Sequence, residues 1–161
     1  MASHPLHIAA AFHTFFSADG RAVRVDMEID RGAGQTTSIR AVRFGIISKT
    51  SPYTHLGRIP IHVNRNANLE SRLSVTAFTQ LRALSLIGGA ASAMRSGRFL
   101  HRRKDVVQLD DVTGLHVRAE APFPYQVDGD DVGDTDELRI RLETDALTVA
   151  LPPPTPRRGR S

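Results

Sequence analysis

The strongest constraint in this sequence is a strict two-residue alternation over residues 23–30. The apolar positions are Val23, Val25, Met27 and Ile29, and the charged positions between them are Arg24, Asp26, Glu28 and Asp30. Successive side chains of a β-strand point to opposite faces, so this segment fits a strand with one buried and one exposed face. Antiparallel sheets commonly have one solvated face, and the alternation therefore predicts an antiparallel strand.

The rest of the chain predicts further short strands and two helices. Strands are expected at residues 42–46, 59–63, 73–77, 106–107, 115–118, 123–127, 138–142 and 147–151, with a turn at 32–35 and a loop at 48–58. Helical spacing of apolar residues predicts one helix near residues 5–16, capped by Ser3, and a second over 78–94. Together these patterns predict a mainly β (α+β) fold: an antiparallel β-sandwich-like domain with an N-terminal helix and one helix in the middle.

Length and charge distribution indicate one domain followed by a basic tail. We expect the domain to span residues 5–152, and residues 153–161 (PPTPRRGRS) to be disordered because they can bury little apolar surface. The net charge is +4, and Arg157, Arg158 and Arg160 of the tail supply three of these charges. With the remainder near +1 and only two tyrosines for base stacking, the sequence argues against a nucleic-acid partner.

Several features bear on the compartment. The sequence has no cysteine, no apolar run long enough to cross a membrane and no signal-peptide pattern at its start. A cytoplasmic location is therefore expected, and peripheral contact with a membrane is compatible with it. Arginine far outnumbers lysine, which favours a bacterial source.

The acidic run 128–137 (DGDDVGDTDE) is the first candidate for chemistry, because clustered oxygen ligands can bind a hard cation. A calcium loop beginning at Asp128 would place Val132 at its fifth position and Arg139 at its twelfth, where oxygen ligands are needed. The pair Asp128-Gly129, flanked by β-type residues, is instead typical of a hairpin turn. From the residues alone, a solvated acidic hairpin and a cation-binding site both stay open.

A basic cluster follows the second predicted helix. Arg102, Arg103 and Lys104 stand together after His101, and they fit either a solvated loop or a contact for phosphate or an anionic membrane. The seven histidines show no metal-ligand spacing, and the sequence contains neither a G-x-S-x-G elbow nor a glycine-rich phosphate loop. No motif by itself therefore establishes a reaction.

A series of segments adds a family resemblance. They are residues 6–16 (LHIAAAFHTFF), 51–57 (SPYTHLG), 66–75 (NANLESRLSV), 122–133 (PFPYQVDGDDVG) and 147–152 (LTVALP). In order and spacing they resemble the C-terminal domain of the diacylglycerol kinase and sphingosine kinase-like lipid kinases. The second and fourth are similar to that family's S-P-Y-T-Y-L-G and P-x-P-x-Q-V-D-G-E-x-x-G segments, and the third to its A-S-x-D-D-G-L-D-V stretch.

This resemblance implies an ATP-dependent kinase that phosphorylates a lipid hydroxyl, with Mg²⁺ as its ion. It implies that Asp130, which aligns with the family's V-D-G-E glutamate, is the general base, and that Glu70 holds the first acidic position of the magnesium-associated stretch. The family's nucleotide domain carries a G-G-D-G-T segment, and nothing like it occurs in these 161 residues. The ATP site would therefore come from a separate nucleotide-binding domain.

The sequence also departs from the family at functional positions. Ser71 replaces the second acid of the magnesium-associated stretch, Arg72 its glycine and Ser74 the following aspartate. Lys49 stands where the family usually has asparagine, and His55 replaces the second tyrosine of Y-T-Y. These changes predict weakened Mg²⁺ binding and a chain that is inactive alone.

Two hypotheses of different class follow. In the first, the chain is the C-terminal half of a diacylglycerol-kinase-like enzyme, with a lipid substrate and a partner that supplies the nucleotide site. In the second, it is a non-catalytic module that associates with lipid or an anionic membrane through Arg102, Arg103, Lys104 and the arginine tail.

Overall fold

The computed structural model describes residues 23–56, 58–80 and 103–146. Within them the fold is mainly β, built from antiparallel sheets, and no helix occurs in these ranges. The predicted helix at 5–16, residues 81–94 of the second predicted helix, the strand at 147–151 and the tail lie outside the described residues. The strands are β1 Val25–Asp30, β2 Thr36–Val42, β3 Phe44–Ser48, β4 Thr54–Leu56, β5 Ile59–Ile61, β6 Leu73–Phe78, β7 Val106–Val112, β8 Gly114–Val127 and β9 Asp130–Arg141.

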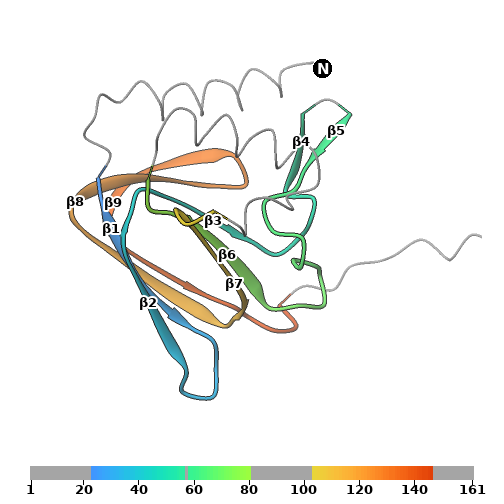
Figure 1. Ribbon diagram of the computed structural model, residues 1–161, viewed down its shortest axis with the longest axis horizontal. Helices are drawn as coiled ribbons and strands as arrows, with labels where there is room; N and C mark the ends of the chain where they lie inside the picture. The colour runs from blue at the N-terminus through green and yellow to red at the C-terminus, as the bar shows by residue number, and fades with distance from the viewer. Residues whose placement is uncertain (1–22, 57, 81–102, 147–161) are drawn as a thin grey trace, which may run out of the picture.

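The strands form a four-stranded sheet in the order β2-β1-β8-β9, a three-stranded sheet in the order β3-β6-β7, and the small pair β4-β5 (Figure 1). All strand pairings among the described residues are antiparallel. Strand β1 pairs with β8 only over residues 114–119. Beyond that point β8 pairs with β9 alone, so the two strands continue as a hairpin arm.

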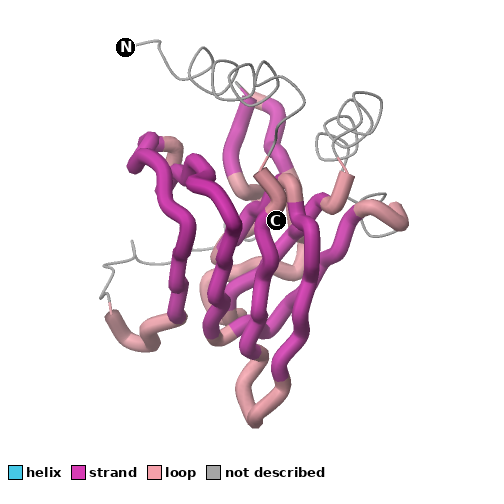
Figure 2. Tube along the Cα trace, turned by 90° about the vertical axis from the view of Figure 1, so that its left-hand side faces the viewer, coloured by secondary structure: helices cyan, strands magenta, loops and turns pink. Residues whose placement is uncertain are grey.

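One apolar core joins the two larger sheets, whose strands make up most of the described trace (Figure 2). The alternation of β1 is confirmed, because Val25, Met27 and Ile29 are buried and the charged residues between them are exposed. Val75 and Ala77 of β6 belong to the same core. A Cβ atom added at Gly45 of β3 would lie 2.6 Å from the Met27 methyl carbon, so the two sheets pack closely there.

Two β-bulges mark where the chain passes between the sheets. Ala41 and Asp111 each have a positive φ, 55° and 60°, and each lies where the pairing register shifts by one residue. Bulges bend a strand and increase its twist. Arg43 follows β2 of the four-stranded sheet, and its N donates to Phe78 O of the three-stranded sheet at 2.8 Å. Thr113 follows β7 of the three-stranded sheet, and its N donates to Asp30 O of the four-stranded sheet at 2.8 Å. The bulges therefore form the corners of the fold.

The structure corrects several predicted boundaries. The predicted strand 42–46 is divided, because Val42 ends β2 and Phe44 begins β3 in a different sheet. The predicted loop 48–58 contains β4, which pairs with β5. The segments 115–118 and 123–127 form one strand, β8, and Phe78, placed at the start of a helix, belongs to β6. None of the described segments forms a helix long and apolar enough to cross a membrane.

Candidate functional site

The tip of the β8–β9 hairpin carries the residues that the sequence singles out. Asp128 and Gly129 connect the strands with φ values of 52° and 94°, the pair of positive φ angles that a two-residue type I′ turn needs. The predicted hairpin turn is therefore confirmed. Asp130 begins β9, pairs with Val127 and exposes its side chain to solvent. Among the described residues, no hydrogen bond or ion pair engages its carboxylate.

Tyr53, from a distant part of the sequence, lies near enough to this tip for the charge of Asp128 to act on its hydroxyl. Tyr53 N donates to Ile61 O at 2.9 Å, which extends the β4–β5 pairing by one residue. The Tyr53 side chain is 40% exposed. Its partial burial raises the pKa of the Tyr53 hydroxyl, and the negative charge of Asp128 raises it further. The hydroxyl therefore stays protonated well above neutral pH and can donate a hydrogen bond beside the turn.

A side-chain contact holds this segment in place. Ser51 Oγ and His62 Nδ1 lie 3.1 Å apart and are hydrogen-bonded, with the donor set by the histidine tautomer. The bond links the residues just before β4 to the residue just after β5. Tyr53 is therefore held at the base of the β4–β5 pair, which Figure 1 shows near the end of β8 and β9.

Glu70 lies in a tight turn between β5 and β6. Asn68 caps this turn, because its Oδ1 accepts from Glu70 N at 2.9 Å and from Ser71 N at 2.8 Å. The Lys49 ammonium donates a hydrogen bond to the carbonyl oxygen of Ser71. Glu70 itself is exposed, and no hydrogen bond or ion pair among the described residues joins it to the hairpin tip. The structure thus places a fixed cation, Lys49, against the turn.

Replacing Lys49 with methionine should lower the free energy of unfolding by about 1–2 kcal/mol, because a charge-assisted hydrogen bond to a partly buried carbonyl is lost while the aliphatic stem is retained. Millimolar Mg²⁺ should restore none of this loss. Urea unfolding with and without Mg²⁺ measures both effects. A Mg²⁺-dependent stabilisation of the wild-type chain would contradict the view that Lys49 organises the turn without a metal.

A polar cluster around Asp110 was missed by the sequence reasoning. Asp110 Oδ1 accepts from Asn64 Nδ2 at 2.7 Å and from Ser74 Oγ at 3.0 Å, and Asp110 Oδ2 accepts from Asn66 Nδ2 at 2.7 Å. Asn64 is 4% exposed and Ser74 is 1% exposed. We call these four residues the Asp110 cluster. It fastens the 64–68 loop to the three-stranded sheet and so supports the neighbouring turn that carries Glu70.

The basic cluster is only partly described. Arg103 is held by Asp105, with Nε to Oδ1 at 3.1 Å and Nη2 to Oδ2 at 2.7 Å. This bidentate pair neutralises Arg103 locally. Lys104 is exposed, and Arg102 lies outside the described residues. Among the described residues of the three predicted anion contacts, Lys104 is therefore the exposed cation.

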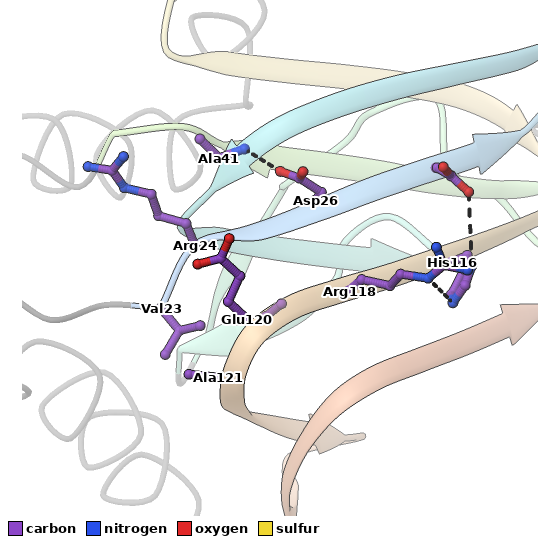
Figure 3. Close-up of a pocket in the computed structure, with 10 residues that line it drawn as sticks. Val23, Arg24, Asp26, Ala41, His116, Arg118, Glu120 and Ala121 are labelled. Carbon is purple, nitrogen blue, oxygen red and sulfur yellow. Dashed lines mark hydrogen bonds and ion pairs between the residues drawn. The ribbon is translucent and has the colours of Figure 1, made fainter.

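A hollow of about 700 Å³ lies on the outer face of the four-stranded sheet, between β1 and β8 (Figure 3). Charged side chains of both signs line it, with the small residues Ala41, Ala119 and Ala121 between them. Asp26 Oδ1 accepts a hydrogen bond at 2.9 Å from the backbone N of Ala41, the residue at the β-bulge. Asp26 therefore has a structural role in this hollow. Among the described residues, no group of three or more His, Cys, Asp or Glu side chains is arranged to hold a metal ion.

Comparison with known proteins supplies no further constraint. No protein-family model matches the chain, and neither the curated proteins nor the solved structures contain a significant match. Functional assignment therefore rests on the residues and their geometry.

Proposed function

We propose that this chain is the C-terminal, β-rich domain of a diacylglycerol-kinase-like lipid kinase and that it works with a separate nucleotide-binding domain. The antiparallel β architecture is compatible with that domain. The finer form of the proposal is a sandwich-like domain over residues 5–152, with a helix at its start and one in its middle.

The observation that supports this proposal best is the convergence of two family-like segments. Residues 51–57 and 122–133 are far apart in sequence, yet the charge of Asp128 in the second reaches the Tyr53 hydroxyl in the first. Tyr53 precedes the short strand β4, and Asp128 lies in the turn between the long strands β8 and β9, which suits a site formed by loops at one end of a rigid scaffold. In this proposal Asp130 accepts the proton of the lipid hydroxyl and Tyr53 donates a hydrogen bond near it.

The state of the 68–72 turn supports the second part of the proposal, that the isolated chain is inactive. Glu70 is the acid left at the predicted Mg²⁺ position, Arg72 adds a cation, and Lys49 already occupies the carbonyl of Ser71. Each of these disfavours a divalent ion at the turn. ATP and its Mg²⁺ would accordingly be held by the partner domain. The chain would supply the lipid-facing surface and the base.

The geometry favours this proposal over a purely electrostatic membrane module. Arg103 is paired with Asp105, so two of the three clustered charges at most can act on an anionic surface. Each such charge contributes only about 1 kcal/mol near a membrane. The acidic hairpin tip would oppose that attraction if it faced the same surface.

A chimaera tests the proposal directly. The full chain is joined to the nucleotide-binding domain of a bacterial diacylglycerol kinase and assayed for transfer of phosphate from ATP to diacylglycerol in mixed micelles. We expect turnover by the chimaera and none by the isolated chain or by the isolated nucleotide domain. An inactive chimaera that binds ATP normally would argue against the assignment, and turnover by the chain alone would overturn its dependence on a partner.

A further inference from the structure

Two arginines lie together at the end of the fold where β1 ends and β8 begins. Arg31 follows the last residue of β1, and Arg72 precedes the first residue of β6. Arg72 Nη1 donates a hydrogen bond to the backbone O of Arg31 at 3.3 Å. Thr113, between β7 and β8, donates to Asp30 O through its N at 2.8 Å and its Oγ1 at 3.1 Å. Three distant parts of the sequence therefore meet at one corner, which we call the arginine corner.

The arginine corner is closely packed around Gly32. A Cβ atom added at Gly32 would lie 3.3 Å from Arg72 Nη1 and 3.6 Å from Thr113 Cγ2. Gly32 also has a φ of 79°, which side-chain-bearing residues rarely adopt. The Arg72 guanidinium is therefore held against the backbone of Arg31 and Gly32, although Arg72 is an exposed residue.

The Arg31 side chain lacks the partner that its burial calls for. Arg31 comes two residues after the buried Ile29 and is only partly exposed. Its Nε is shielded from solvent, and no hydrogen bond or ion pair engages its guanidinium in the part of the chain that the structure describes. Buried polar groups are nearly always hydrogen-bonded, and a charge withdrawn from water without a counter-charge costs free energy.

The chain supplies few acids that could fill this place. Asp30 Oδ1 accepts a hydrogen bond from Gly32 N at 2.7 Å, and successive side chains of a strand point to opposite faces. No ion pair joins Arg31 or Arg72 to an acid among the described residues. In the rest of the sequence, Asp19 is the one acidic side chain. The two guanidinium groups thus form a positive corner without a counter-charge from the described residues.

We propose that the arginine corner binds a phosphate monoester group, carried by a soluble ligand or by a lipid headgroup. A guanidinium presents its donors as a planar fork that matches the oxygens of phosphate, and two such groups offset the two negative charges. The phosphate also supplies the partner that the half-buried Arg31 lacks.

The arginine corner is separate from the proposed catalytic tip. Asp30 pairs with Gly114, the first residue of β8, whereas the turn at Asp128 follows the last residue of this 14-residue strand. Figure 1 shows the turn after β1 at the end of the fold away from the tip of β8 and β9. Phosphate binding at the corner therefore goes beyond the proposed function and does not depend on it.

Thermal melts of the full chain in inorganic phosphate test the site. At neutral pH and constant ionic strength, exchanging chloride for about 20 mM phosphate should raise the Tm of the wild type by about 2–4 °C. Arg72→Gln and Arg31→Gln should each lose most of this rise, and calorimetric titration should show phosphate affinity about tenfold lower in each. Arg40→Gln, which removes an exposed cation from β2, should keep the full rise.

Arg72→Gln keeps the test independent of folding, because Arg72 is exposed and its removal leaves the partly buried Arg31 in place. The absence of a rise in the wild type would overturn the proposal. An equal rise in the wild type and all three variants would overturn it as well, because phosphate would then act as a general salt. A rise found only in Asp19→Asn would mean that the chain's own carboxylate fills the corner, which also contradicts the proposal.

Vesicles distinguish the source of the phosphate. The wild type and Arg72→Gln are sedimented with phosphatidylcholine vesicles that contain or lack phosphatidic acid. Binding that requires phosphatidic acid and weakens about tenfold in Arg72→Gln identifies a lipid headgroup as the ligand. A phosphate-dependent rise in Tm without such vesicle binding identifies a soluble ligand. Vesicle binding that is equal in the two chains excludes the headgroup at this corner.

Discussion

Replacing Asp110 with alanine should lower the free energy of unfolding by about 3 kcal/mol, one of the two largest effects expected for this chain. The carboxylate accepts hydrogen bonds from Asn64, Asn66 and Ser74, and two of these donors are almost fully buried. Removing the acceptor leaves the buried donors without a partner, and each such group costs about 1–3 kcal/mol. The loss of the bonds themselves is the smaller part of the effect.

Asp110→Asn separates charge from shape. The amide has nearly the same size, but its NH₂ group faces one of the three donors, so we expect about half of the alanine effect. Asp111→Asn is the matched control, because Asp111 is exposed and asparagine tolerates its φ of 60°. Urea unfolding should show that control within about 0.5 kcal/mol of the wild type. An Asp110→Ala chain as stable as the control would mean that the cluster does not hold the 64–68 loop.

The Asp110 cluster also shows where sequence reasoning reaches its limit. The alternation of β1 predicts its buried face correctly, because that information is carried by neighbouring residues. Asp110 lies 36 residues from Ser74 and 46 from Asn64, so their contact depends on tertiary structure. A local signal was present in β7, where the polar Gln108 and Asp110 alternate with Val107 and Leu109. It marks a polar face without naming the partners.

The strand boundaries show a second limit. Val42, Phe44 and Ile46 continue one alternating pattern, yet the chain changes sheets at Arg43. The bulge responsible centres on Ala41, a residue type with no preference for positive φ, so no glycine or asparagine marks it. Conversely, Pro122 and Pro124 suggest a break, but β8 continues through them. Pro122 lies where the register with β9 is irregular, between Arg118 and Phe123, and at Pro124 the strand pairs only with β9 among the described strands, which leaves its other edge unpaired.

The candidate site contains one feature that adjacent residues determine and others that depend on tertiary structure. The Asp128-Gly129 turn follows from two adjacent residues and was predicted correctly. The effect of Asp128 on the Tyr53 hydroxyl depends on tertiary structure, and only the resemblance made the two segments candidates for one site. The role of Lys49 in the 68–72 turn could not be anticipated, because it depends on a contact across 22 residues.

The largest functional effect is expected at Asp130. In the chimaera, Asp130→Asn should lower turnover by a factor of about 100 or more, because an amide cannot take the proton from the lipid hydroxyl. Asp130→Glu restores the family's longer side chain and should raise turnover about tenfold, since proton transfer is sensitive to a displacement of about 1 Å. Steady-state assays at saturating diacylglycerol measure both changes as kcat.

Two neighbouring acids make this prediction specific to Asp130. Asp134→Asn removes the same charge from an exposed position paired with Pro124 farther along β9, and it should leave kcat within about twofold of the parent chimaera. Burial raises the pKa of Tyr53, and Asp128→Asn removes the charge that raises it further. If Asp128→Asn abolishes turnover and Asp130→Asn does not, the base lies in the turn itself and the alignment of Asp130 with the family's glutamate is wrong. If all three variants lose activity equally, the acids act only through the summed negative charge of the hairpin, and no single one of them is the base.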